Sequence, residues 1–459
     1  MPSDKGSSPP TVAGHAQASR RNRSFQRSSV TILLFLLPLA LLWRFYPSPM
    51  EYFQRLGPAT IEQRVEKILK TTPLIDGHND LAFLLRALYG NHIYEDNFTS
   101  KFENGGFAGH ADLPRLKAGL NGGAFWSVYW PCPANGSDYS DEAYREIVQD
   151  TLLQIDVVAR LRDAYPEHFS GNVNGNTALK AFQSGKFISP LGIEGLHQIG
   201  NSPGNLRLYY ELGVRYATLT HNCGNRYADA ALWESPLRKA PPVWGGLSED
   251  GKRLVDEMNR IGMIVDLAHV SEDTMRHVLG AGGDGWRGSR APVIFSHSSA
   301  YALCPHPRNV PDDVLRLVRD RRSVVMVNFA PDFVSCVDAS DHRDDGLPDF
   351  YPPNSTLEHV ADHIIHIGQV AGFDHVGLGS DFDGILNTPK GLEDVTKFPN
   401  LVAELLRRGV SDEDAAKVVG GNLLRVWKEI DAVAARLQRD NEPVLEDDLE
   451  PLPWLHALR

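Results

Sequence analysis

The sequence predicts an α/β fold, a closed (β/α)8 barrel of the TIM type, on two observations. Eight short apolar runs alternate along the chain with segments of helical periodicity, which indicates a parallel sheet with crossover helices. Metal-binding residue types follow most of these runs, and in such barrels the site lies at the C-terminal ends of the strands. An open doubly wound sheet is the alternative, but no Gly-x-Gly-x-x-Gly sequence follows the first run, which weakens a dinucleotide-binding interpretation.

The N-terminal part of the chain differs in composition from the body. Residues 1–29 are rich in Ser, Arg, Gln and Pro and are expected to form a disordered basic segment. Residues 30–46 are apolar and predict a transmembrane anchor, with a cleaved signal peptide as the alternative. The arginines before this run would stay in the cytoplasm, so the body, residues 51–439, would be extracytoplasmic at a membrane. Residues 440–459 form an acidic tail.

Helices and strands in the body follow from local spacing. Residues 51–72 and 140–163 carry apolar residues at helical intervals. Ser271 suits the N-cap of a helix, and 311–319 begins with a proline, which fits a first turn. Residues 82–120 are Gly-rich and are expected to form an excursion over one end of the fold. The predicted strands are 74–78, 124–130, 187–194, 214–220, 263–268, 293–296, 324–329 and 376–379. Further predicted helices are 204–212, 248–262, 355–370, 398–408, 412–419 and 421–437.

Charge and cysteine content limit the class of protein. The net charge is −12 and the body has no stretch rich in Lys and Arg, which argues against a nucleic-acid partner. Four cysteines fit an oxidising compartment and allow three pairings; they are Cys132, Cys223, Cys304 and Cys336. Three sequons are candidate glycosylation sites on a secreted surface: Asn97, Asn135 and Asn354.

Metal-type ligands form a convergent set at the predicted strand ends. Imidazoles with carboxylates suit zinc or a similar transition metal, and the set is large enough for two zinc ions. His78 and Asp80 alternate onto one face and would bind one metal. His269 and His297 would bind the other, and Glu194 would bridge. Two metals about 4 Å apart can hold a hydroxide and polarise a carbonyl, as hydrolysis requires. The convergent set is His78, Asp80, Glu194, His221, His269, His297 and Asp381.

Three further histidines lie at helical spacing, His359, His363 and His366. They belong to a predicted helix and lie away from the strand ends. A solvated or half-buried helix face is therefore favoured for them over a metal site.

Eight short motifs follow one another along the chain, and six of them contain the metal-type ligands. They are Asp76-Gly77-His78-Asn79-Asp80, Gly122-Gly123-Ala124-Phe125-Trp126-Ser127, Gly192-Ile193-Glu194-Gly195, Leu219-Thr220-His221-Asn222, Asp266-Leu267-Ala268-His269, Phe295-Ser296-His297-Ser298-Ser299, Arg308-Asn309-Val310-Pro311-Asp312-Asp313 and Asp381-Phe382-Asp383-Gly384. These motifs occur in the same order as in the membrane (renal-type) dipeptidases, a family of two-zinc peptidases. The chain resembles that family over residues 60–435. The resemblance implies zinc-dependent hydrolysis of the peptide bond of dipeptides by a metal-bridging hydroxide.

The resemblance also implies roles for individual residues. It implies the same division of ligands, with Glu194 bridging. His221 would contact the substrate, and Arg308 would bind its C-terminal carboxylate, which the guanidinium fork matches. Asp381 would be the acid/base group that passes a proton to the leaving amine, with Asp383 as the fallback. The implied disulfides join Cys132 with Cys223 and Cys304 with Cys336.

The chain departs from the family pattern in three respects. Mammalian relatives are tethered by a C-terminal lipid signal, whereas this chain is expected to be tethered at its N-terminus. They carry an extra cysteine between subunits, which is absent here and leaves a non-covalent homodimer open. Phe333 stands near the position where relatives carry a tyrosine close to the substrate, so side-chain preference could differ.

Two other functions are alternatives. The first is a binuclear amidohydrolase that acts on another amide or lactam and does not require a free C-terminal carboxylate. The second is a non-catalytic barrel that serves as a surface receptor. Loss of a metal ligand would indicate the receptor, and no ligand of the family pattern is missing.

Overall fold

The structure is a computed structural model that describes residues 59–339 and 344–449. The predicted disordered segment, residues 1–29, and the predicted anchor or signal peptide, residues 30–46, lie outside the described residues. Among the residues that are described, no helix combines the length and the apolar character needed to cross a membrane.

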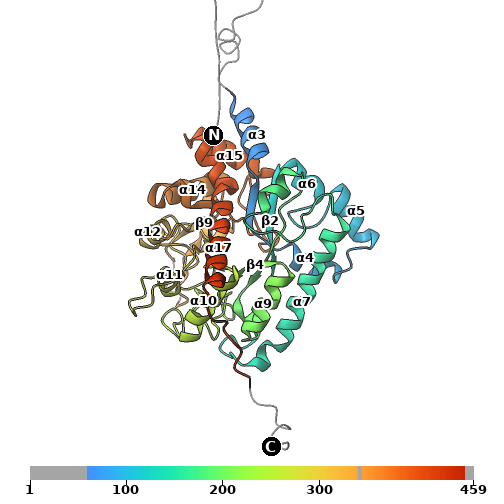
Figure 1. Cartoon of the computed structure of the whole chain (residues 1–459). Coiled ribbons are helices and arrows are strands. Elements are labelled where there is room, and N and C mark those ends of the chain that lie inside the picture. Colours follow the sequence, from blue (N-terminus) through green and yellow to red (C-terminus); the bar gives the residue numbers. More distant parts are fainter. Residues whose placement is uncertain (1–58, 340–343, 450–459) are drawn as a thin grey trace, which may run out of the picture. The chain divides into compact units, whose positions relative to one another are not determined.

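The eight predicted strands form one parallel sheet that closes into a barrel, with helices on its outside (Figure 1). The strand order is β1-β2-β3-β4-β7-β8-β9-β12. Backbone hydrogen bonds join the first strand to the segment after the last. The N–H of Asp381 donates to the carbonyl of His78 at 3.1 Å, and that of Asp80 to the carbonyl of Phe382 at 2.9 Å. The predicted (β/α)8 architecture is confirmed. The strands are β1 (Leu74–Asn79), β2 (Asn121–Val128), β3 (Leu191–Glu194), β4 (Val214–Thr218), β7 (Ile264–Asp266), β8 (Ile294–Phe295), β9 (Val324–Val327) and β12 (Val376–Leu378).

The surrounding helices begin mostly where the sequence indicates. Six of them follow a Ser or Thr whose hydroxyl accepts a hydrogen bond from a backbone N–H in the first turn, the usual N-cap arrangement. Ser271 does this for α11, as predicted. The helices are α3 (Ile61–Thr71), α7 (Asp141–Ala164), α8 (Ala178–Gln183), α9 (Pro203–Leu212), α10 (Glu249–Ile261), α11 (Glu272–Val278), α12 (Asp312–Asp320), α13 (Pro331–Val334), α14 (Leu357–Ala371), α15 (Phe398–Arg407), α16 (Asp412–Ala416) and α17 (Asn422–Arg439).

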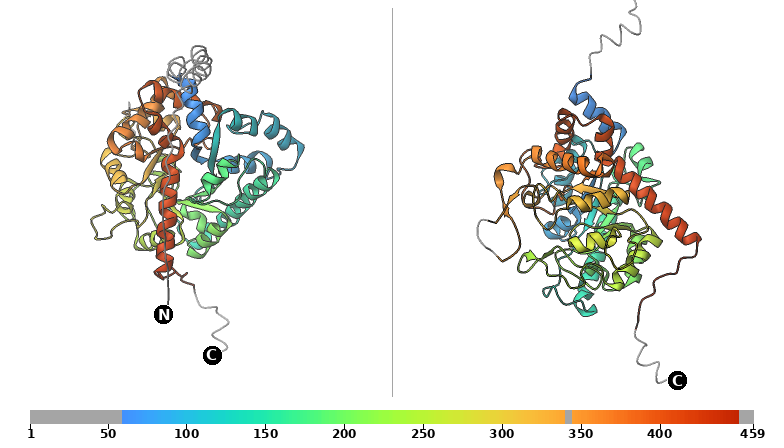
Figure 2. Two further views of the ribbon diagram at one scale, coloured as in Figure 1. Left: turned by 45° about the horizontal axis from the view of Figure 1, so that its top comes forward. Right: turned by 90° about the vertical axis from the view of Figure 1, so that its left-hand side faces the viewer.

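A series of aromatic rings in the barrel interior links helix α17 to the C-terminal ends of the strands. Trp427 of α17 is buried, and its ring centroid lies 5.1 Å from that of Phe125. The Phe125 ring lies 5.2 Å from the ring of Tyr216, whose hydroxyl lies 2.8 Å from Nδ1 of His78. Figure 2 shows α17 along its length. The barrel core therefore supports His78 through Tyr216, and close packing limits the movement of this imidazole.

The Gly-rich excursion at 82–120 has more regular structure than the sequence indicated. It contains the helices α4 (Leu81–Tyr89), α5 (Asp96–Asn104) and α6 (Leu113–Ala118). Phe98 and Phe102 are fully buried and stack at 5.0 Å between ring centroids. These aromatic contacts stabilise helices that are too short to be stable alone. Two short hairpins were also not predicted: β5 (Leu232–Trp233) with β6 (Arg238–Lys239), and β10 (Cys336–Val337) with β11 (Asp349–Phe350).

Two disulfides join loops at the ends of the strands. Cys132 pairs with Cys223, and Cys304 pairs with Cys336, with sequence separations of 91 and 32 residues. These are the pairings that the family resemblance implies. The first joins the loops after β2 and β4, and the second joins the loops after β8 and β9, so both disulfides restrain loops around the mouth of the barrel.

Removal of the shorter disulfide is expected to lower stability without preventing folding. In the chain-entropy description, a bridge that closes a loop of this length stabilises a protein by about 2–4 kcal/mol. The double variant Cys304→Ala/Cys336→Ala should therefore unfold at lower denaturant concentration than the parent. Peptide mapping without reduction should find the Cys132–Cys223 peptide in both proteins. An unchanged unfolding midpoint, or four free thiols in the parent protein, would contradict the assignment.

Candidate active site

Five predicted metal ligands meet at the C-terminal ends of β1, β3, β7 and β8. Nε2 of His78 lies 3.1 Å from Oδ2 of Asp80 and 3.5 Å from Oε1 of Glu194. The same Oε1 lies 2.9 Å from Nε2 of His269 and 3.4 Å from Nε2 of His297. All five side chains are buried. One carboxylate oxygen thus lies within reach of ligand atoms from both predicted pairs, as a bridging role for Glu194 requires.

The imidazole of His78 is oriented by a tyrosine from inside the barrel. Nδ1 of His78 lies 2.8 Å from the hydroxyl of Tyr216, so Nε2 is directed toward the carboxylates. Gly192 makes room for this tyrosine, because a Cβ there would collide with the Tyr216 ring. Such an outer hydrogen bond fixes the tautomer and orientation of a metal-binding histidine.

The imidazoles of His269 and His297 also have hydrogen-bond partners at Nδ1. Nδ1 of His269 lies 2.9 Å from Oδ1 of Asn222, and Nδ1 of His297 lies 2.8 Å from Oγ of Ser296. The Ser296 hydroxyl in turn donates to Oδ2 of Asp266 at 2.6 Å. His269 adopts a left-handed backbone conformation with φ of 65°, which is uncommon outside glycine and typical of functional positions. All three Nε2 atoms are therefore directed to one point.

Burial and charge determine the protonation of the cluster. Burial lowers the pKa of His269 and of His297 well below the usual value, which keeps both imidazoles neutral. Burial opposes protonation of His78 as well, but the negative charges of Asp80 and Glu194 raise its pKa to about 10. Burial also raises the pKa of Glu194 well above its usual value. A divalent cation at this buried point would offset the negative charges of these carboxylates.

The residues fit divalent metal ions. Oδ1 of Asp80 is buried and has no hydrogen-bond partner in the described part of the chain, although buried polar atoms are normally paired. The ligand atoms of His78, Asp80 and Glu194 lie within 4.8 Å of one another, as do those of Glu194, His221 and His269. Nitrogen and carboxylate oxygen ligands in this combination suit zinc.

His221 and Asp381 flank the ligand cluster. The ring of His221 lies 4.4 Å from the ring of His269, and burial lowers its pKa well below the usual value. Asp381 lies near His78 and His297, and its Oδ2 accepts a hydrogen bond from Nδ2 of Asn328 at 3.1 Å. The structure thus brings both predicted catalytic residues to the cluster.

Arg308 lies in the same cavity and has unpaired donors. Its side chain is buried, and neither Nε nor Nη2 has a hydrogen-bond partner among the described residues. Burial lowers the pKa of Arg308 to about 10, so the guanidinium stays charged at neutral pH. Its carbon lies 4.9 Å from the centre of the Phe333 ring. A cavity of about 570 Å³ is lined by Arg308 together with His221, Glu194 and Asp381.

Asp383, the fallback acid/base residue, is engaged elsewhere. Its Oδ1 accepts a hydrogen bond from the backbone N–H of His110 at 2.5 Å, and its own N–H donates to Nδ1 of His110 at 2.9 Å. Asp381 has no such pairing with His110 and faces the ligand cluster. The geometry therefore favours Asp381.

The three histidines of α14 make structural contacts. Nε2 of His363 lies 2.8 Å from the carbonyl oxygen of Val334. His359 and His366 each lie beside a carboxylate, at 3.0 Å from Asp362 and 2.8 Å from Asp312. His359 and His366 are half-buried as predicted, but His363 is fully buried, so the predicted solvated or half-buried face is wrong for that residue.

A family-level comparison agrees with this geometry. The family described as Membrane dipeptidase (Peptidase family M19) matches residues 62–441. The chain belongs to the membrane dipeptidase family. Two similar proteins are dipeptidases by name. Dipeptidase aclJ of Aspergillus oryzae is 44% identical over 434 residues, 94% of each chain. Dipeptidase tcpJ of Claviceps purpurea is 44% identical over 384 residues, 84% of this chain and 83% of that one.

Solved structures of other proteins share the fold of this membrane dipeptidase family member. A metallopeptidase from Rhodobacter sphaeroides, liganded with a phosphinate mimic of the dipeptide L-Ala-D-Ala, is 27% identical with a TM-score of 0.63 and covers 78% of this chain and 99% of its own. The probable dipeptidase PvdM from Pseudomonas aeruginosa is 23% identical with a TM-score of 0.68 and covers 82% and 99%. The family, the barrel and a metallopeptidase class of hydrolase are thereby established.

The sequence did not reveal the residues that orient the ligands of this dipeptidase family site. Tyr216 and Asn328 come from other strands than the residues they contact, so no local pattern connects them. Asn222 and Ser296 offered a weak signal, because each directly neighbours a predicted site histidine. Polar residues beside a ligand are candidates for such outer contacts.

Proposed function

We propose that the protein is a two-zinc dipeptidase that hydrolyses the single peptide bond of free dipeptides. The observation that carries this proposal is Arg308, a buried guanidinium with unpaired donors in the cavity that contains the ligand cluster. A buried cation without a partner favours an anionic ligand, and a free C-terminal carboxylate matches its fork. The family membership and the dipeptide mimic in the Rhodobacter relative support the same substrate class.

Each residue then has a defined task. His78, Asp80, Glu194, His269 and His297 hold the two ions, which when bound supply a Lewis acid for the peptide carbonyl and activate water. Arg308 fixes the carboxylate and so aligns the scissile bond with the cluster. His221, neutral because of burial, hydrogen-bonds the carbonyl oxygen as negative charge develops on it. Asp381 accepts a proton from the attacking water and passes it to the leaving amine.

A hydrolysis screen tests the proposal. The zinc-loaded protein should cleave free dipeptides and should cleave tripeptides and C-terminally amidated dipeptides poorly. Equal cleavage of free and amidated dipeptides would instead favour an amidohydrolase with a broader substrate. Absence of hydrolysis together with tight dipeptide binding would favour a receptor.

Substitution of Arg308 is expected to weaken the capture of free dipeptides. Loss of a charge-assisted hydrogen bond costs about 1.5–3 kcal/mol, so Arg308→Ala should lower kcat/KM roughly ten- to a hundred-fold. Arg308→Lys should restore activity only in part, because an ammonium group cannot match both carboxylate oxygens. The control is the amidated dipeptide, whose slow cleavage should change little in either variant. An unchanged kcat/KM for free dipeptides in Arg308→Ala would contradict the carboxylate role.

The cellular location, the glycosylation and the oligomeric state are part of the same proposal. We propose a membrane-anchored enzyme whose catalytic body is extracytoplasmic, supported by the two disulfides, which are typical of oxidising compartments. The sequons at Asn97, Asn135 and Asn354 lie on exposed residues, as glycosylation requires. A non-covalent homodimer stays a prediction, which light scattering of the secreted protein would test.

A further inference from the structure

Asp332 is an ionisable residue of the cavity that the proposed mechanism does not use. It belongs to the short helix α13, directly before Phe333, and lines the cavity together with Arg308. Asp332 is exposed to solvent at the rim of the cavity, and its carboxylate has no hydrogen bond or ion pair among the described residues. Desolvation by its surroundings nevertheless raises the pKa of Asp332. An unpaired carboxylate in a substrate cavity favours a cationic group on the ligand.

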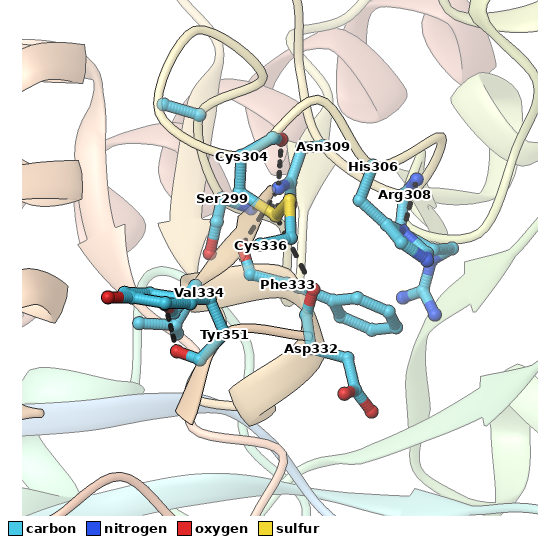
Figure 3. The surroundings of a disulfide bond; sticks show 12 residues. Ser299, Cys304, His306, Arg308, Asn309, Asp332, Phe333, Val334, Cys336 and Tyr351 are labelled. Atoms are coloured by element: carbon cyan, nitrogen blue, oxygen red, sulfur yellow. Dashed lines mark hydrogen bonds between the residues drawn. A yellow bond between two sulfur atoms is a disulfide. The ribbon is translucent and has the colours of Figure 1, made fainter. Parts of the chain in front are cut away.

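A disulfide holds Asp332 and Phe333 against the segment that carries Arg308. Cys304 is bonded to Cys336, and Nδ2 of Asn309 donates to the carbonyl of Phe333 at 2.8 Å and to that of Cys304 at 2.9 Å. Figure 3 shows the side chains of Arg308, Phe333 and Asp332 on the same side of this disulfide. The relative positions of the three side chains are thus largely fixed before a ligand binds, which reduces the entropic cost of binding.

The position beside Arg308 identifies which substrate residue meets Asp332. The guanidinium carbon of Arg308 lies 4.9 Å from the Phe333 ring, so a carboxylate bound by Arg308 lies next to that ring. In a dipeptide this carboxylate belongs to the C-terminal residue, whose side chain leaves the adjacent carbon atom. The C-terminal side chain is therefore the group within reach of Phe333 and Asp332.

We infer that Asp332 and Phe333 form a subsite for a basic side chain on the C-terminal residue of the dipeptide, lysine or arginine. The inference rests on the proposed dipeptidase function and deepens it. The aliphatic stem of such a side chain packs along the Phe333 ring, and its cation reaches the Asp332 carboxylate. The Phe333 ring offers no hydroxyl, so the carboxylate of Asp332 supplies the polar contact.

Matched substrates measure this preference directly. Ala-Lys and Ala-norleucine have side chains of similar length that differ in charge, and Ala-Glu reverses the charge. A solvent-exposed ion pair combined with a cation–π contact corresponds to about a five- to twenty-fold preference for the charged side chain. The zinc-loaded parent should therefore show a ratio of kcat/KM for Ala-Lys over Ala-norleucine in this range, with Ala-Glu poorest of the three.

Variants assign the preference to a residue. Asp332→Asn should bring the ratio of Ala-Lys to Ala-norleucine close to one. Glu234→Gln is the matched control, because Glu234 is the carboxylate that lines the same cavity from the connection between β4 and β7. This control should keep the parent ratio. A ratio near one in the parent, or loss of the preference in Glu234→Gln but not in Asp332→Asn, would overturn the inference.

A binding measurement separates failure of this inference from failure of the proposed function. Phosphinate mimics of Ala-Lys and Ala-norleucine should bind the zinc-loaded parent with the same ratio of affinities by calorimetry, and Asp332→Asn should remove the difference. Hydrolysis of all dipeptides without a charge preference would refute only the subsite. Absence of any hydrolysis would refute the dipeptidase proposal, while the calorimetric ratio would still test the subsite.

Discussion

The variant Glu194→Gln is expected to lose measurable dipeptide hydrolysis and to bind less metal than the parent. Oε1 of Glu194 lies within 3.5 Å of Nε2 of His78, His269 and His297. A neutral amide carries no charge to offset two dications, and its nitrogen is a donor where the site needs an acceptor. In the proposed two-zinc site this one side chain would bind both ions, so one substitution is expected to weaken both. Metal analysis after gel filtration, together with a dipeptide assay, measures the effect.

A second buried glutamate offers the matched control. Glu257 of α10 is buried and pairs with Arg207 at 3.0 Å and with Arg260 at 2.7 Å. Glu257→Gln removes a buried charge of the same type far from the strand ends and should lower stability while metal content and hydrolysis remain. Full metal occupancy with normal activity in Glu194→Gln would contradict the bridging assignment. Equal metal loss in both variants would attribute the effect to destabilisation.

The barrel and the convergence of most candidate ligands could be predicted because both depend on local periodicity. His78 and Glu194 lie at the ends of β1 and β3, and His269 and His297 lie within a few residues after β7 and β8. The topology of a closed barrel brings such positions together. The predicted strand boundaries extend past the observed ones at several places. At Leu219 and Leu267, just beyond β4 and β7, the backbone N–H still donates to the neighbouring strand, although the regular ladder has ended.

The helices at 82–120 and the outer contacts of the ligands could not be predicted for a different reason. Glycines such as Gly90 and Gly105 end helices α4 and α5 at positive φ, and in the sequence they are not distinguishable from glycines of an irregular loop. The contacts of Tyr216 with His78 and of Asn328 with Asp381 join residues far apart in the chain. They depend on the packing of the barrel.

The choice between Asp381 and Asp383 shows where strand periodicity fails. Alternation along an extended strand puts both carboxylates on one face. The backbone instead adopts the left-handed conformation at both residues, with φ of 64° and 70°. The chain turns here, and Asp383 is directed to His110. A prediction based on extended geometry could not separate the two residues, because the separation arises from two positive φ angles at non-glycine positions.

Asp381→Asn is expected to lower kcat roughly 100- to 10,000-fold, the usual contribution of a general acid/base group. An amide of the same size keeps the hydrogen-bonding position beside Asn328 but cannot accept a proton from water or deliver one to the leaving amine. Asp381 is not among the five proposed metal ligands, so the variant should retain both ions. This separates it from Glu194→Gln, which should lose metal and activity together. Stopped assays with concentrated enzyme, and metal analysis of the same preparation, measure both quantities.

Asp383→Asn provides the internal control for this prediction. Asp383 lies two residues further along the chain, is also buried, and also lines the cavity, but its carboxylate is held by His110. Its substitution should affect the position of the 107–110 segment and thus KM more than kcat. A large fall in kcat for Asp383→Asn with a small one for Asp381→Asn would transfer the acid/base role to Asp383. Comparable losses of kcat with loss of metal in both variants would instead show that the segment after β12 supports the metal ions rather than proton transfer.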